Sequence, residues 1–142
     1  VERHSAFGHG RVPPIIAFRN LVANMIPERF PTLRIGFLEA SAGWVPYVLH
    51  ALRRQSQQRG GDFSDRDLFK RYRIFVACEA DEDIDYLARY IGEDNMIIGS
   101  DYGHNDPSEE RELVKTMKSR EDVPSFITDK ILSDNPQRFY GL

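Results

Sequence analysis

Three carboxylates in this sequence stand directly after short apolar runs, where a side chain could take part in chemistry. Glu39 follows residues 33–38, Glu79 follows residues 73–78, and Asp101 follows residues 96–100. Short apolar runs bounded by turn-forming residues are typical of buried strands, and parallel strands bring their carboxyl ends to one edge of a sheet. Acids gathered there could bind a divalent metal, orient a water molecule or transfer protons. The alternative is that each acid caps the next helix or complements its dipole, which explains a single acid at least as well.

The surrounding residues distinguish the candidates. Glu79 opens the acidic run of residues 79–83, in which we expect Asp81 to cap the next helix and the other acids to be solvated, so its functional case is the weakest. His104 follows Asp101 by three residues, on a loop that would lie over the strand ends. There it could hydrogen-bond a substrate or support Asp101, or equally brace the loop. None of the four histidines has the close spacing of a metal-ligand pair.

The elements that position these residues are predicted by periodicity. Apolar residues at helical spacing predict helices over residues 13–29, 44–57, 65–70, 81–91, 108–119, 124–132 and 135–140. Strands that alternate with helices imply parallel strands joined by right-handed crossovers, and therefore an α/β protein. Three strands are few for a complete sheet, and a closed α/β barrel needs roughly 250 residues. We therefore expect residues 1–142 to form a single incomplete domain, the C-terminal βα units of a distorted (β/α)8 TIM barrel.

Composition argues against several other classes. The chain has 142 residues, 41% of them hydrophobic and 29% charged, so it can form one ordinary core. Its 19 Lys and Arg against 22 Asp and Glu give a net charge of −3, and the scattered basic residues argue against a nucleic-acid partner. No apolar run reaches the roughly 18 residues of a membrane span, which argues against a membrane partner. The single cysteine, Cys78, allows no intrachain disulfide, so we expect a cytoplasmic protein. Because the sequence starts at Val1, we also expect that upstream residues are missing.

Three segments in the expected order resemble the amidohydrolase-2 family. Residues 27–46 resemble the signature around its sixth strand, residues 97–106 the signature around its eighth strand, and residues 130–142 its terminal helix. The resemblance implies a metal-dependent TIM-barrel protein of the amidohydrolase superfamily. Its divalent metal, commonly zinc or manganese, would serve hydrolysis or non-oxidative decarboxylation of aromatic or unsaturated acids. The resemblance also implies a metal-ligand role for Asp101.

This chain departs from the pattern of the amidohydrolase-2 family at three points. The family's first-strand His-x-His pair and fifth-strand histidine have no counterpart in this chain and are expected upstream of it. The decarboxylase branch carries a histidine near the position of Glu39, so the histidine-centred proton chemistry of that branch is not implied here. Gly103 stands where proline is common, although the spacing of Asp101 and His104 is retained.

The sequence thus predicts an enzyme in its full-length form, a metal-dependent hydrolase or carbon–carbon lyase acting on a small carboxylic-acid or aromatic substrate. Asp101 would be a metal ligand or water-orienting base, with Glu39 and His104 as neighbouring catalytic groups, while this chain alone would be inactive. The alternative is a non-catalytic α/β binding module. Unpaired strand edges predict a homo-oligomer or association with the missing N-terminal portion. The aromatic residues near the strand ends, Trp44, Tyr47 and Tyr102, are interpreted as packing residues rather than ligand contacts.

Overall fold

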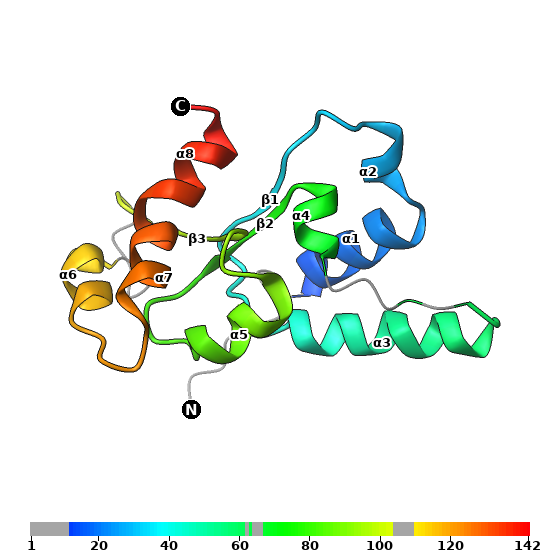
Figure 1. Cartoon of the computed structure of the whole chain (residues 1–142), viewed down its shortest axis with the longest axis horizontal. Coiled ribbons are helices and arrows are strands. Elements are labelled where there is room, and N and C mark those ends of the chain that lie inside the picture. The colour runs from blue at the N-terminus through cyan, green and yellow to red at the C-terminus, as the bar shows by residue number, and fades with distance from the viewer. Residues whose placement is uncertain (1–11, 62, 64–66, 104–109) are drawn as a thin grey trace.

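The computed structural model describes residues 12–61, 63, 67–103 and 110–142, so His4, His9 and His104 lie outside the described residues. The elements in chain order (Figure 1) are α1 (Val12–Ala23), α2 (Ile26–Arg29), β1 (Ile35–Phe37), α3 (Val45–Gln58), α4 (Leu68–Tyr72), β2 (Ile74–Cys78), α5 (Ile84–Ile91), β3 (Met96–Ile98), α6 (Leu113–Lys118), α7 (Ser125–Asp129), the π-helical turn η2 (Lys130–Asp134) and α8 (Asn135–Tyr140). Within the described ranges, no helix has the length and apolar composition needed to cross a membrane.

The three strands form one parallel sheet in the order β1–β2–β3 (Figure 1). Gly36 of β1 is in register with Phe75 of β2, and Ala77 of β2 is in register with Ile97 of β3. The spatial order equals the chain order, as in consecutive strands of an α/β barrel, whereas a doubly wound sheet reverses its order at a switch point. The prediction of an α/β fold with parallel strands is confirmed.

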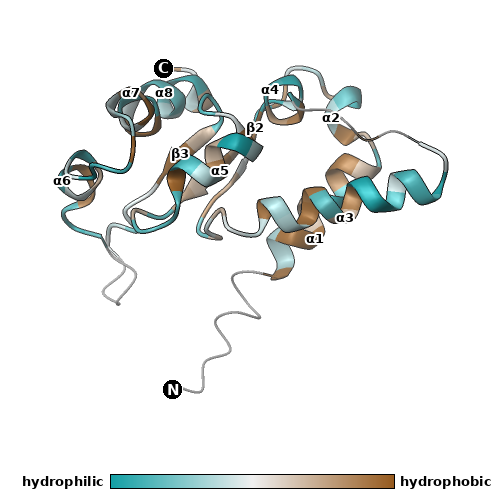
Figure 2. Cartoon of the chain, turned by 60° about the horizontal axis from the view of Figure 1, so that its bottom comes forward, coloured by the Kyte–Doolittle hydropathy of each residue, from teal (hydrophilic) through white to brown (hydrophobic). Residues whose placement is uncertain are grey.

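The main core lies between one face of the sheet and the helices. Phe18 of α1 packs against Phe37, Trp44 and Phe69, whose ring centroids lie 5.6, 5.3 and 5.5 Å from its own. The buried residues of α3 recur at helical spacing and face this core, whereas the far end of α3 is hydrophilic (Figure 2). An apolar stripe of this kind determines which side of a helix packs on a sheet.

The C-terminal helix covers the opposite face of the sheet. Phe139 of α8 packs against a smaller cluster formed by Phe75, Ala77 and Ile97, and its ring centroid lies 5.2 Å from that of Phe75. Gly36 leaves room for this ring, because a Cβ there would lie 2.5 Å from Phe139 Cζ. All five residues of β2 are buried as a result, as expected of a central parallel strand covered on both faces.

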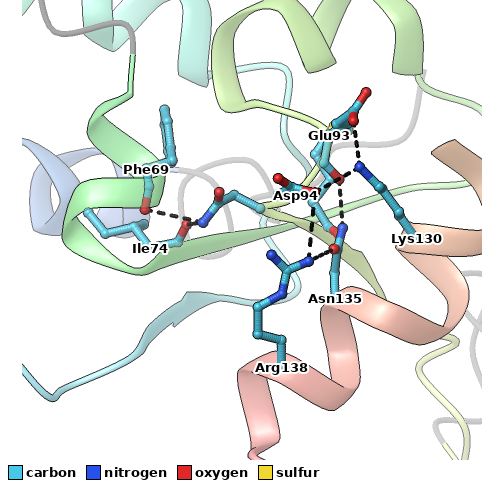
Figure 3. Close-up of polar contacts among 9 residues, drawn as sticks. Phe69, Ile74, Glu93, Asp94, Lys130, Asn135 and Arg138 are labelled. Carbon is cyan, nitrogen blue, oxygen red and sulfur yellow. Dashed lines mark hydrogen bonds and ion pairs between the residues drawn. The ribbon is translucent and has the colours of Figure 1, made fainter.

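Two buried asparagines bind backbone carbonyls near the amino ends of the strands (Figure 3). Asn135 donates from Nδ2 to the carbonyls of Glu93 and Met96, at 2.7 and 2.6 Å. Asn95 donates from Nδ2 to two carbonyls of the α4 and β2 segments, at 3.1 and 2.9 Å. The asparagines therefore fasten α8 and α4 to the sheet. Each hydrogen bond also gives a partner to a side-chain amide and to a backbone carbonyl that would otherwise be buried without one.

Charged side chains reinforce the attachment of the C-terminal helices. Lys130 Nζ lies 2.5 Å from Glu93 Oε1 and 2.9 Å from Asp94 Oδ1, and Arg138 Nη2 lies 3.8 Å from the same Asp94 oxygen (Figure 3). In α/β barrels the amino ends of the strands serve stability, whereas the carboxyl ends carry the active site. The network is therefore structural, and the opposite edge of the sheet is the place to examine for chemistry.

The helix predicted over residues 13–29 is wrong as a single element. It breaks between α1 and α2, where Met25 adopts a left-handed backbone conformation with φ of 52°. Pro27 has no N–H to donate to the carbonyl four residues earlier, and its ring clashes with that carbonyl. Pro27 instead stands in the first turn of α2, where a missing N–H costs nothing.

The two helices predicted over residues 124–132 and 135–140 are joined in the structure. Between them lies η2, in which Asn135 N donates to Lys130 O. This hydrogen bond spans five residues, one more than in an α-helix. Pro136 lacks the amide hydrogen that the next α-helical bond would need, so the helix widens by one residue there.

Candidate functional site

The parallel pairing places the three strand-end acids at the same edge of the sheet. Glu39 stands two residues after β1, Glu79 directly after β2, and Asp101 three residues after β3. Glu39 and Glu79 are exposed, and Asp101 is half-buried. This is the carboxyl edge, where the loops of α/β barrels carry catalytic groups.

Two of these acids hold an unusual backbone conformation. Glu39 has φ of 54° and Asp101 has φ of 51°, and Ser41 in the same loop as Glu39 has φ of 51°. Side chains with a Cβ rarely adopt this left-handed region, and where they do the strain costs about 1–3 kcal/mol and clusters at functional sites. Met25 and Arg73, which lie away from this edge, share the conformation, so it favours a role for the two carboxylates only in combination with their place at the carboxyl edge.

The acidic run after β2 differs from the prediction. Asp83, not Asp81, caps α5, because its Oδ1 accepts a hydrogen bond from Tyr86 N at 3.0 Å. Glu82 was expected to be solvated, yet its carboxylate binds backbone N–H groups. In a run of several acids, only the true start of the helix decides which residue caps it, and the sequence did not resolve that start.

Glu82 connects the loop after β1 to the loop after β2. Its Oε1 accepts from Gly43 N at 2.8 Å, its Oε2 accepts from Glu79 N at 2.9 Å, and both oxygens lie 3.0 Å from Ala42 N. Gly43 permits the close approach, since a Cβ there would lie 3.3 Å from Oε1. Sequence reasoning missed Glu82, because no local pattern reveals a contact across 40 residues.

Arg120 binds the loop after β2 as well. Its Nη1 donates to the carbonyls of Ala80 and Glu82, at 2.8 and 2.7 Å, and its guanidinium also pairs with Asp122. The Arg120 side chain is only 15% exposed, and the Asp122 carboxylate raises the pKa of the guanidinium. The segment between α6 and α7 is thereby tied to the loop after β2, a contact that sequence reasoning also missed.

Cys78, at the end of β2, is unsuited to nucleophilic or metal chemistry. Burial, and then the negative charge of Glu82, raise the pKa of its thiol to about 12. The thiol is therefore neutral at physiological pH, and it donates to the carbonyl of Ile97 at 3.3 Å. Only the thiolate is a strong nucleophile or metal ligand.

The described residues do not complete a metal site. Within them, no three His, Cys, Asp or Glu side chains come together to hold an ion. Even an open catalytic zinc site uses three protein ligands. Asp101 could supply one carboxylate, and His104, the other residue predicted from the same motif, lies outside the described residues. A metal at this edge would need further ligands from outside the described segments.

The three aromatic residues near this edge behave differently. Trp44 is buried and donates from Nε1 to Ser41 O at 2.9 Å, so its interpretation as a packing residue is confirmed. That interpretation is wrong for Tyr47 and Tyr102, which are 70% and 90% exposed. Tyr102 lines an open cleft of about 490 Å³, together with Ser100, Glu110, Arg111, Glu112, Leu113, Val114 and Lys115.

Comparison with known proteins supports the fold. No protein-family model matches the chain, and no curated protein matches it. Among solved structures, an amidohydrolase from Mycobacterium avium subsp. paratuberculosis K-10 is similar, with a TM-score of 0.71 and 21% sequence identity. The match covers 91% of this chain and 34% of that one, so the chain spans about a third of the length of the amidohydrolase. The chain is a mixed α/β structure that matches part of an amidohydrolase barrel.

Proposed function

We propose that this chain forms part of a metal-dependent enzyme of the amidohydrolase type, a hydrolase or a non-oxidative decarboxylase. The observation that carries the proposal is the carboxyl edge of the sheet, where Glu39 and Asp101 keep carboxylates on a left-handed backbone. The strand order and the likeness to part of an amidohydrolase support it at the level of the fold.

In this proposal Asp101 is a metal ligand or the base that orients a water molecule. Glu39 and His104 are the neighbouring catalytic groups, and the remaining ligands come from other segments of a longer protein. A bound zinc or manganese ion would polarise a carbonyl group or lower the pKa of a water molecule. An ionised Asp101 carboxylate can accept the proton of that water, and it acts as a general base only within hydrogen-bond reach of it.

Groups near the end of β3 support a proposal for the substrate class. We propose a small carboxylic acid or an aromatic compound. The exposed ring of Tyr102 can stack on an aromatic group. Arg111 and Lys115 line the same cleft and can attract a carboxylate, and Glu110 and Glu112 line it beside them. Lys115 also lies 3.3 Å from Glu112, so a substrate carboxylate would compete with that side chain for it.

The test is an activity screen on the longest natural form of the protein that contains this chain. Esters, lactones and amides would report hydrolysis, and carbon dioxide release from aromatic acids would report decarboxylation. We expect activity that a chelator removes and zinc or manganese restores, and a loss of about 100-fold or more in Asp101→Asn. The 142-residue chain alone should be inactive.

Chelator-resistant activity that Asp101→Asn leaves intact would contradict the proposal. A protein with neither metal nor activity would favour the second reading, a non-catalytic α/β binding module whose acids are structural. That reading predicts unchanged ligand binding in Asp101→Asn.

We also propose that the sheet edges take part in association. Among the described residues β1 and β3 each pair with one strand only, so each leaves an edge that further strands can extend. Those strands come from the rest of a longer protein or from a second copy. If a second copy supplies the strands, light scattering on the 142-residue chain should give a mass above 16.4 kDa. A stable monomer would contradict that source and leave the rest of a longer protein.

A further inference from the structure

We propose that Glu82 is a positioning residue for the candidate site, which holds the loops that begin at Glu39 and Glu79 in place. The inference rests on the proposed function, because it concerns the same carboxyl edge. It assigns a role to a residue whose carboxylate is occupied by backbone N–H groups and which does not directly follow a strand.

The first argument is the convergence of donors on one carboxylate. Three backbone N–H groups, of Ala42, Gly43 and Glu79, point at the two oxygens of Glu82 at 2.8–3.0 Å. Two of these groups belong to the loop after β1, and the third belongs to Glu79, the residue directly after β2. Hydrogen bonds to an ionised acceptor are roughly twice as strong as neutral ones, so one side chain determines how two loops lie relative to each other.

The second argument is the strain in the loop that Glu82 holds. Between β1 and α3, two residues with a Cβ, Glu39 and Ser41, adopt left-handed backbone conformations. Such conformations persist only where surrounding contacts enforce them. The contacts that hold this loop include the Glu82 bonds to Ala42 and Gly43. The indole of Trp44 on the carbonyl of Ser41 and the hydroxyl of Ser41 on the carbonyl of Ala40 add to them. Without Glu82, the N–H groups of Ala42 and Gly43, in the loop that presents Glu39, lose their side-chain acceptor.

The third argument is that Glu82 is itself held in position. Glu82 N donates to Glu79 O at 3.3 Å, and Arg120 Nη1 donates to the carbonyls of Ala80 and Glu82. The turn that carries the carboxylate is therefore fixed from the segment between α6 and α7. A positioning side chain must itself be rigid, and these contacts provide that rigidity.

The test compares two variants of equal charge in the longest natural form of the protein. Glu82→Gln keeps the shape of the side chain, but its NH2 group replaces an acceptor and leaves at least one of the three N–H groups without a partner. Asp81→Asn is the control, because it removes the same charge from an exposed neighbour. Hydrogen exchange of residues 39–43 should accelerate by about tenfold or more in Glu82→Gln and stay unchanged in Asp81→Asn.

Chemical rescue separates positioning from a loss of packing. Glu82→Ala vacates the space between the three N–H groups, and formate can place a carboxylate there. Added formate should slow the exchange of residues 39–43 in Glu82→Ala towards the wild-type rate, whereas chloride at equal ionic strength should not. Unchanged exchange in both Glu82 variants, or no response to formate, would overturn the inference.

Catalytic rate connects the loop to the site, because the loop after β1 carries Glu39, whereas the proposed metal ligand Asp101 stands after β3. If the wild-type protein is active, Glu82→Gln should lower kcat by about tenfold or more, measured below the unfolding transition of both proteins, and Asp81→Asn should not. An unchanged kcat in a variant with accelerated exchange would overturn the positioning role while the proposed function stands. A wild-type protein with neither metal nor activity would reject the proposed function, and the positioning role with it.

Discussion

At the scale of single residues, the candidate site depends on where the backbone presents carboxylates. Glu39 and Asp101 could be identified from the sequence because each directly follows an apolar run. Their left-handed backbone conformations could not be predicted from the sequence, because φ at one residue depends on contacts with distant segments. Glu82 was mistaken for a solvated acid for the same reason, because the N–H groups of Ala42 and Gly43 that it binds lie about 40 positions earlier in the chain.

Cys78 provides a prediction at this scale. Burial and the charge of Glu82 raise the pKa of its thiol to about 12, so it should stay neutral and unlabelled by iodoacetamide at about pH 8 in the folded protein. Mass spectrometry should find one modified cysteine only after unfolding in urea. Rapid complete labelling under native conditions would contradict the buried placement.

At the scale of elements, the apolar spacing predicted the strands and the helices that cover them, because amphipathic periodicity is a local property. Helix boundaries were less accurate. Helices were predicted over residues 65–70, 81–91 and 108–119, and the structure has them at Leu68–Tyr72, Ile84–Ile91 and Leu113–Lys118. Prolines account for two further differences. The helix predicted to run through Pro27 breaks before it. The two helices predicted on either side of residues 133–134 are instead joined, with a π-helical turn before Pro136. The contacts that fasten α8 to the sheet through Asn135 are long-range and could not be predicted.

Asn135 provides a prediction for the attachment of α8. Asn135→Ala removes two donors from the carbonyls of Glu93 and Met96, and each unsatisfied buried carbonyl costs about 1–3 kcal/mol. Urea denaturation should show a free energy of unfolding lowered by at least that amount. The exposed residue of the same helix gives the control, because Gln137→Ala should change stability by less than about 0.5 kcal/mol. Equal effects of the two variants would show that Asn135 does not fasten the helix.

The ion pairs of Lys130 should make this attachment sensitive to acid. The hydrogen bond from Lys130 lowers the pKa of Asp94 below its ordinary value. A lowered carboxyl pKa stabilises the fold above the unfolded-state pKa of about 4, and this stabilisation is lost as the pH falls through the folded-state pKa. The stability difference between wild type and Lys130→Met, measured by urea denaturation, should therefore shrink below about pH 4. A difference of equal size at about pH 2 and pH 6 would contradict the pairing.

At the scale of the whole molecule, the sheet order explains how the site can form. Three parallel strands in chain order present their carboxyl ends along one edge, and α8 occupies the face that carries Phe75. The fold class could be predicted because alternating strands and helices permit few arrangements. The ligand set could not be completed, because the described residues bring no three suitable side chains together and the chain spans about a third of the amidohydrolase it matches.

The most direct test of the central claim is metal binding by the longest natural form of the protein. Stoichiometry from elemental analysis and affinity from titration calorimetry would be compared among wild type, Asp101→Asn and the exposed control Asp129→Asn. The proposal predicts a bound divalent ion in wild type and in the control, and an affinity lower by about tenfold or more in Asp101→Asn. Metal bound equally by all three proteins, or by none of them, would contradict the assignment of a metal-dependent site to this edge of the sheet.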